Sequence, residues 1–169
     1  MQPIADIARR VRPKGVLLHT DAAQSAGKIP VDVQALGADL LSLAGHKLYA
    51  PKGIGALYVR RGVTLEKFMH GASQEAGWRA GTENVLEIAG LGKACEIAHR
   101  DLQRNAAHMR QTRDALESGL RAGVGDMMRV NGHPEGRLPN TLSVSFRGRD
   151  AQALLRGIGH RVAASAGAA

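Results

Sequence analysis

Short apolar runs that alternate with helical patterns are the feature that most constrains the fold of this 169-residue chain. Each run is about six residues long, a length typical of a buried strand and too short for a helix. Pro3 opens one helical pattern, and residues 31–36 form a second, shorter one. Apolar strands separated by helices predict an α/β fold with a sheet of buried strands. The predicted strands are Gly15–Thr20, Asp39–Ala44 and Ile54–Arg60.

The second half of the chain has a different organisation. A polar, glycine-rich loop at residues 71–82 precedes a helical pattern that runs from Glu83 to about Arg121. This is far longer than an average helix of about 11 residues, so it could link two domains. Beyond it, residues 142–146 alternate as a half-buried strand does, residues 151–157 form a short helix, and residues 161–165 begin another strand.

Composition excludes several classes of function. The net charge of +8 suits anionic partners such as phosphates, or it reflects a fragment or a genome rich in arginine. The basic residues form no dense run and aromatic residues make up 3% of the chain, so nucleic-acid binding is not expected. No apolar run approaches the roughly 18 residues of a membrane span, and the N-terminus is not a signal peptide.

The single cysteine, Cys95, rules out an intrachain disulfide framework and a multi-cysteine zinc site. It fits a reducing cytosol, so we expect a cytoplasmic protein. Cys95 has helical spacing with Ile88 and Leu91, which favours a small buried thiol over a nucleophile.

Polar side chains gather where two of the predicted strands end. Asp21 and Gln24 follow the first strand, and His46 and Lys47 follow the second. Ligands of open α/β sheets sit at the carboxyl ends of strands. A lysine amine can form a Schiff base with an aldehyde cofactor, and a carboxylate can keep a pyridine nitrogen protonated. Gln24 could donate to a phenolic oxygen, while His46 and Thr82 could bind a phosphate. The alternative is that Asp21 caps a turn and Lys47 is a solvated strand end.

Several segments in order resemble the class V, pyridoxal-phosphate-dependent cysteine desulfurases, with the selenocysteine lyases as close relatives. The resemblance covers Gln2 to Ala169. It implies part of the type I fold of these transferases, with the end of the large, mostly parallel-sheet domain at 1–84, a linking helix at 85–122, and the start of a small α+β domain at 123–169. The segments are HTDAAQ, GHKLYAPKGIGALY, RAGTENV, RLPNTLSVSF and ASAGAA.

The resemblance also implies a role for each candidate residue. Lys47 is the catalytic residue and forms the internal aldimine with pyridoxal 5'-phosphate. Asp21 pairs with the pyridine nitrogen, Gln24 bonds the phenolic oxygen, and His46 contacts the phosphate. Thr82 reaches the phosphate in the partner subunit of a homodimer. No metal is implied.

The implied reaction removes sulfur from L-cysteine and leaves L-alanine and an enzyme persulfide. The sulfur then passes to a scaffold or acceptor protein for iron-sulfur cluster assembly, and L-selenocysteine is the variant substrate. The persulfide-forming cysteine of the family follows the SAGAA motif, so we expect it beyond Ala169 and expect this chain to be an inactive central fragment. Two alternatives stay open: another class V enzyme, and a non-catalytic α/β fragment that acts only in dimerisation.

This sequence departs from the family pattern in the residues around the phosphate. Ala44 stands where many members have serine, and Ala50 stands where glycine is usual before Pro-Lys-Gly. In the glycine-rich loop, Ala72 and Ser73 replace glycines and Ala76 replaces a common arginine. Either these changes weaken phosphate binding more than the chemistry of Lys47, or they are ordinary variation between subgroups of the family, which is the interpretation we favour.

Overall fold

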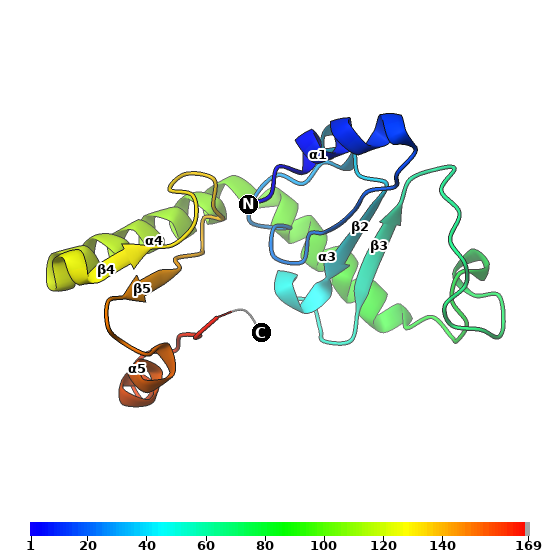
Figure 1. Ribbon diagram of the computed structural model, residues 1–169. Helices are drawn as coiled ribbons and strands as arrows, with labels where there is room; N and C mark the ends of the chain where they lie inside the picture. Colours follow the sequence, from blue (N-terminus) through cyan, green and yellow to red (C-terminus); the bar gives the residue numbers. More distant parts are fainter. Residues whose placement is uncertain (168–169) are drawn as a thin grey trace. The chain divides into compact units, whose positions relative to one another are not determined.

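The computed structural model describes residues 1–167, which form two compact units (Figure 1). The first unit comprises residues 2–105, and the second comprises Met1 together with the residues from Ala106 onward. The last two alanines of the predicted SAGAA segment lie outside the described residues.

The first unit is built around a three-stranded sheet in the order β1-β2-β3. The strands are β1 (His19–Asp21), β2 (Leu40–Ala44) and β3 (Gly55–Val59). β1 and β2 are parallel, and β3 runs antiparallel to β2, so the sheet is mixed. All three predicted strands are present, but β1 is much shorter than predicted. The prediction that the strands are buried is wrong, because Leu41 is the one residue of these three strands that is buried. Gly15 has a left-handed φ of 70° and ends the 3-10 turn Arg12–Lys14, so the chain enters the sheet only at His19.

Helices flank this sheet and begin where the sequence provides a cap. α1 (Ile4–Val11) starts after Pro3, as predicted. α2 (Val33–Leu36) lies in the crossover between β1 and β2, and its N-cap Asp32 accepts hydrogen bonds from the amides of Gln34 and Ala35 at 2.8 and 3.1 Å. α3 (Val85–Arg100) is capped by Asn84, whose side chain accepts from the Glu87 amide at 3.3 Å.

The long helical pattern from Glu83 to Arg121 forms two helices in place of one. α3 ends at Arg100 and α4 (Leu102–Val124) follows after a single residue, Asp101, whose φ of −101° and ψ of 7° are not helical. The helical hydrogen-bond pattern nevertheless passes through this residue, because the Asp101 amide bonds Ile97 O at 3.0 Å. The division into segments 1–84, 85–122 and 123–169 stays a proposal.

Small residues make up much of the core of the first unit. Leu48, Leu91 and three buried alanines form a cluster against which Leu43, Ile54 and Ala98 pack. Cys95 is half-buried against the same cluster, which fits a packed thiol. Glycine permits close approach here: a Cβ on Gly27 would lie 2.6 Å from Cδ2 of Leu48. The buried alanines are Ala26, Ala50 and Ala94.

The second unit contains most of α4, a two-stranded antiparallel sheet and a final helix. After the 3-10 turn Gly125–Met127 come β4 (Met128–Val130), β5 (Val144–Phe146) and α5 (Ala151–Ile158). The predicted strand 142–146 begins only at Val144, and the predicted start of a strand at 161–165 is wrong, because these residues are exposed and irregular. Among residues 1–167, no helix combines the length and the apolar character needed to cross a membrane.

Candidate functional site

The parallel pairing of β1 and β2 brings two groups of predicted site residues to one edge of the sheet. Asp21 is the last residue of β1 and is in register with Ser42 of β2. β2 ends at Ala44 and continues directly into the 3-10 turn η2 (Gly45–Leu48), which carries His46 and Lys47. The carboxyl ends of the two strands therefore present Asp21, His46 and Lys47 at the same edge, with exposed side chains.

Backbone hydrogen bonds fix the turn that follows β1. The Ala22 amide extends the pairing with β2 by donating to Ser42 O at 2.9 Å, and the Ala23 amide donates to Oδ1 of Asp21 at 2.8 Å. The Ala26 amide then closes a helical turn onto Ala22 O at 2.9 Å, and the Ala26 side chain is buried. Gln24 lies on the outer side of this turn, and its exposed amide is available to a ligand.

Tight packing fixes η2, which carries the lysine. The Gly45 amide donates to Ile54 O at 2.9 Å, and a Cβ on Gly45 would lie only 2.8 Å from that oxygen. At the other end of the turn Leu48 is buried, while Tyr49 has a left-handed φ of 63° and a fully exposed ring. The backbone of this turn is held by β3 and the core, so Lys47 projects from a rigid support.

A lysine that the sequence analysis did not single out lies close to Lys47. Lys28 is half-buried, and its pKa lies below the ordinary lysine value because burial disfavours the ammonium and the charge of Lys47 repels it. Within residues 1–167, no carboxylate forms an ion pair with either lysine. Two neighbouring ammonium groups without an acidic partner fit an anionic group such as a phosphate. The signal in the sequence was a lysine directly after Gly27, in the turn that follows Asp21.

Thr82 belongs to a separate loop of the first unit. It is exposed, between the 3-10 turn Glu75–Gly77 and α3. Side-chain and backbone hydrogen bonds close this loop, because the Gly81 amide donates to Oε1 of Gln74 at 3.1 Å and the Ala80 amide to Met69 O at 3.2 Å. No hydrogen bond among residues 1–167 joins Thr82 to the residues at the sheet edge. Four of the five predicted residues therefore lie at the ends of β1 and β2, and Thr82 lies on a separate loop. The four are Asp21, Gln24, His46 and Lys47.

The arrangement of residues fits pyridoxal phosphate. One edge of the sheet offers a lysine amine, a carboxylate with one oxygen engaged by its own turn, an amide, an imidazole and a second ammonium. These groups match an aldehyde, a pyridine nitrogen, a phenolic oxygen and a phosphate in chemical type.

Comparison with known proteins decides the family. The family model for aminotransferase class-V matches residues 1–169, the whole chain. The chain belongs to the class V aminotransferase family. Members of this family depend on pyridoxal phosphate, in agreement with the groups at the sheet edge.

Relatives of this class V chain are named as cysteine desulfurases. It is 48% identical to the cysteine desulfurase of Gluconacetobacter diazotrophicus over 90% of the chain and 38% of that protein. It is 45% identical to the cysteine desulfurase IscS of Anaeromyxobacter dehalogenans over 100% of the chain and 42% of that protein. The structure of a NifS-like protein from Rickettsia africae aligns with a TM-score of 0.89 and 31% identity, over 95% of the chain and 44% of that structure. The chain thus spans about two fifths of the length of these relatives.

Proposed function

We propose that the protein to which this chain belongs is a pyridoxal-phosphate-dependent cysteine desulfurase. The observation that carries the proposal is the placement of Asp21 and Lys47 at the ends of two paired parallel strands. The names of the relatives, at 43–48% identity, support the choice of reaction within the class V family.

Each residue of the edge has a defined task in this proposal. Lys47 would hold the cofactor at its aldehyde group through the side-chain amine, and the Asp21 carboxylate would keep a proton on the pyridine nitrogen. Gln24 donates to the phenolic oxygen, and His46 binds the phosphate. Pyridoxal phosphate supplies an electron-withdrawing ring that stabilises negative charge on the substrate carbon. These roles are the ones that the resemblance to the class V family implies, and the chemistry of each side chain and its position at the sheet edge are compatible with them.

The overall reaction balances without any further reactant. Sulfur leaves the side chain of L-cysteine and bonds to a cysteine thiol of the enzyme, which gives L-alanine and an enzyme persulfide. The persulfide sulfur then passes to an acceptor protein for iron-sulfur cluster assembly. Cys95 is half-buried against the core of the first unit, so we assign the persulfide to a different cysteine of the complete protein. The single cysteine of this chain is in keeping with a cytoplasmic protein.

The first experiment tests cofactor binding by the purified chain. Addition of pyridoxal phosphate is expected to produce a visible absorbance band and to raise the melting temperature, since a ligand that binds the folded state stabilises it. The band should be lost in Lys47→Ala and retained in Lys52→Ala, a matched control because Lys52 is an exposed lysine five positions along the same segment. A band of equal size in both variants would remove Lys47 from its proposed role.

The second experiment tests the reaction. In a chimera, this chain replaces the matching segment of the Anaeromyxobacter dehalogenans relative, because the match covers 100% of this chain and 42% of that protein. The chimera should release L-alanine from L-cysteine, and Lys47→Ala should abolish this release. Parallel assays with L-selenocysteine distinguish a selenocysteine lyase from a desulfurase. A folded chimera that binds the cofactor but releases no alanine from either substrate would overturn the proposed reaction.

The same chimera tests the proposed homodimer, in which Thr82 serves the partner's site. When Lys47→Ala and Thr82→Ala subunits are mixed, a mixed dimer has one site with both residues intact. We therefore expect the mixture to regain activity that neither variant shows alone. If mixing restores nothing although subunits exchange, Thr82 does not act across the dimer.

A further inference from the structure

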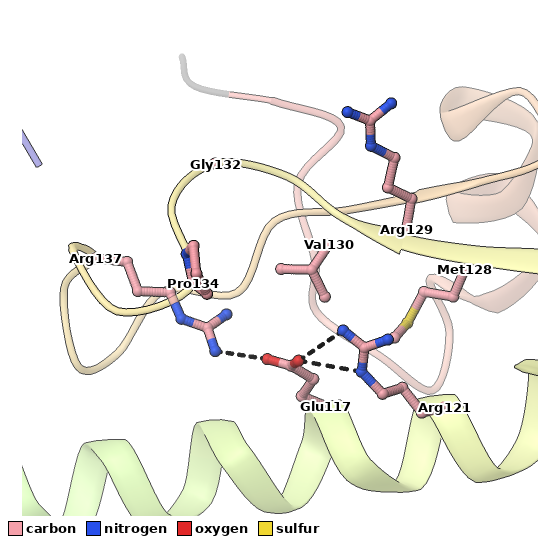
Figure 2. Close-up of a pocket in the computed structure, with 8 residues that line it drawn as sticks. All are labelled: Glu117, Arg121, Met128, Arg129, Val130, Gly132, Pro134 and Arg137. Carbon is pink, nitrogen blue, oxygen red and sulfur yellow. Dashed lines mark hydrogen bonds and ion pairs between the residues drawn. The ribbon is translucent and has the colours of Figure 1, made fainter. Parts of the chain in front are cut away.

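A cavity of about 370 Å³ lies in the second unit, between α4 and β4 (Figure 2). Glu117 and Arg121 of α4 form one side of it, and Val130 and Pro134 lie across from them. This volume falls within the range of small-molecule sites. Among the residues that the structure describes, those proposed to hold pyridoxal phosphate do not line this cavity.

Arg137 brings unsatisfied hydrogen-bond donors to the cavity. Its side chain is 16% exposed, and its Nη2 donates to Oε2 of Glu117 at 2.6 Å. Its Nε and Nη1 are buried and have no hydrogen-bond partner among residues 1–167. Since buried donors in folded proteins are nearly all paired, these two call for an acceptor that the described chain does not supply.

The ion pairs around Arg137 leave one positive charge uncompensated. Glu117 pairs with Arg137 and with Arg121, the latter at 3.0 Å. Asp114 pairs with Arg113 at 2.6 Å and lies 4.0 Å from Arg137. Within residues 106–167, no further carboxylate pairs with these three arginines. Three guanidinium groups thus share two carboxylates, and the charge of the largely buried Arg137 is poorly screened by solvent.

Glu117 has no oxygen left for the remaining donors of Arg137. Its Oε1 accepts from Nε and Nη2 of Arg121 at 3.2 and 3.0 Å, and its Oε2 accepts from Nη2 of Arg137. The hydrogen bond from Arg137, followed by that from Arg121, holds the pKa of Glu117 below its ordinary value. The carboxylate is therefore charged at neutral pH and fully engaged, so the free donors of Arg137 require a second acceptor.

We propose that this cavity binds a small organic monocarboxylate through Arg137. Free N–H groups of a guanidinium donate charge-assisted hydrogen bonds to carboxylate oxygens, and such bonds are roughly twice as strong as those between neutral groups. One negative charge matches the excess of one positive charge in the network. An ordered water could satisfy a donor, but it would leave that charge uncompensated.

The walls of the cavity favour an organic ligand. Met128, Val130 and Pro134 provide apolar surface for a short carbon chain. Arg129 also lines the cavity, but Figure 2 shows its guanidinium pointing away from Glu117, so we assign the carboxylate to Arg137. This inference does not depend on the proposed function.

The test follows methyl NMR signals of the purified chain while sodium butyrate is added. The signals of Met128 and Val130 should shift in a saturable manner, and that of Leu48 in the core of the first unit should not. Butyramide, the neutral amide of similar shape, should cause no saturable shift. Arg137→Lys keeps the charge without the guanidinium and should weaken binding by about 10- to 100-fold, as expected for one hydrogen bond to a charged group. Arg129→Met is the matched control and should retain nearly the full affinity.

A variant that fills the cavity provides a second measurement. Val130→Phe leaves the ion pairs of Arg137 in place and should abolish butyrate binding, while the Met128 signal reports that the second unit is still folded. Lys47→Ala should bind butyrate as the unmodified chain does. Loss of the cofactor site and loss of this site are therefore distinguishable.

Three results would overturn the inference. Equal shifts with butyrate and butyramide would show that the charge is not recognised. Equal shifts with butyrate and sodium chloride would show only a general effect of anions. If the folded chain shows no saturable shift of Met128 and Val130, the cavity has no carboxylate site and water satisfies the donors of Arg137.

Discussion

Asp39 and Arg60 form an ion pair at the sheet edge opposite the candidate site, with Nε of Arg60 2.6 Å from Oδ1 of Asp39. Asp39 precedes β2, and Arg60 follows β3. Oδ2 of Asp39 accepts from the Leu18 amide at 2.8 Å, just before β1. The Asp39 side chain is 5% exposed, so one buried carboxylate ties together all three strands.

Replacement of Asp39 by alanine is expected to lower the free energy of unfolding of the first unit by roughly 3 kcal/mol. The substitution removes two hydrogen bonds to a charged group and leaves the Leu18 amide without its acceptor. Trp78, the single tryptophan, lies in this unit and reports urea unfolding by fluorescence. Asp6→Ala is the control, because it breaks an exposed pair with Arg9 and should cost less than about 1 kcal/mol.

The same pair predicts a pH dependence. The hydrogen bond from the Leu18 amide, followed by that from Arg60, holds the pKa of Asp39 below its ordinary value. A carboxyl whose pKa is lower in the folded state stabilises the fold above its unfolded pKa of about 3.9, and this stability is lost as the pH falls through the folded value. The stability difference between the unmodified chain and Asp39→Asn should therefore be larger at pH 7 than at acidic pH. A difference that is constant with pH would show that charge on Asp39 is not involved.

In the second unit, Glu117 joins two arginines of unequal burial (Figure 2). Oε2 accepts from Arg137 at 2.6 Å, and Oε1 accepts from Arg121 at 3.0 Å. The bond from Arg137 comes from its Nη2, while its Nε and Nη1 are buried and have no hydrogen-bond partner within residues 1–167. These residues line a cavity of about 370 Å³ beside β4. Glu117 is therefore the nearer carboxylate to Arg137, at 2.6 Å against 4.0 Å for Asp114, and Glu117 keeps a second cation, Arg121, if Arg137 is removed.

This asymmetry predicts that Glu117→Gln destabilises the second unit more than Arg137→Met does. Loss of the carboxylate leaves a largely buried guanidinium with only Asp114, 4.0 Å away, and removal of one partner of a buried pair costs roughly 3 kcal/mol. After loss of Arg137, by contrast, Glu117 keeps its ion pair with the exposed Arg121, so the cost is smaller. Urea unfolding followed by circular dichroism should rank the two variants in this order. Lys93→Met, which removes an exposed pair with Glu96, should have little effect. A larger loss for Arg137→Met than for Glu117→Gln would contradict the argument.

Local sequence was sufficient to predict the parts of the fold that local interactions determine. The strands and α1 follow from apolar spacing and turn residues, and the edge carrying Asp21 and Lys47 follows from strand ends. The break at Asp101 was missed because its neighbours keep helical spacing and no glycine or proline marks it. The antiparallel direction of β3 depends on pairing with β2, which spacing does not specify. Lys28 was missed because its neighbour, Lys47, lies on another segment of the chain.

Gly45→Ala is expected to disrupt the site through the backbone. The added methyl group would lie 2.8 Å from both the carbonyl oxygen and Cγ2 of Ile54, so η2 has to move away from β3. Overpacking of this kind costs about 1–3 kcal/mol, and the displacement carries Lys47 with it. We expect a lower melting temperature and at least about 10-fold weaker cofactor binding, the result of roughly 1.4 kcal/mol of lost interaction.

The control for Gly45→Ala is a glycine with free space around it. Gly92 lies within α3, and a Cβ there would meet no atom within 4 Å. Gly92→Ala should raise the free energy of unfolding by about 0.5–1 kcal/mol, since alanine favours the helix. If Gly45→Ala lowers the free energy of unfolding while Gly92→Ala raises it, the loss at Gly45 is caused by the contact with Ile54. A loss of similar size at both positions would contradict this assignment.

Lys28→Met is expected to raise the stability of the chain without cofactor and to weaken its response to the cofactor. Burial and repulsion by Lys47 lower the pKa of Lys28, so its charged form disfavours folding in the absence of an anion. This penalty is fully present below the folded pKa and disappears as the pH rises past the unfolded value of about 10.4. Without cofactor, Lys28→Met should therefore melt at a higher temperature than the unmodified chain at pH 7, and the gain should shrink toward pH 10.

With pyridoxal phosphate present, the order should reverse. The unmodified chain gains stability when the cofactor takes up the Lys47 amine at its aldehyde, which removes the repulsion of Lys28, and when the phosphate neutralises Lys28. Lys28→Met lacks this second contribution, because it has no charge to pair with the phosphate. Lys52→Met, at an exposed position, should show neither effect. Free phosphate at the same concentration distinguishes a general anion effect from binding of the whole cofactor. If Lys28→Met melts below the unmodified chain without cofactor and keeps its full response to pyridoxal phosphate, Lys28 only supports the fold and takes no part in anion binding.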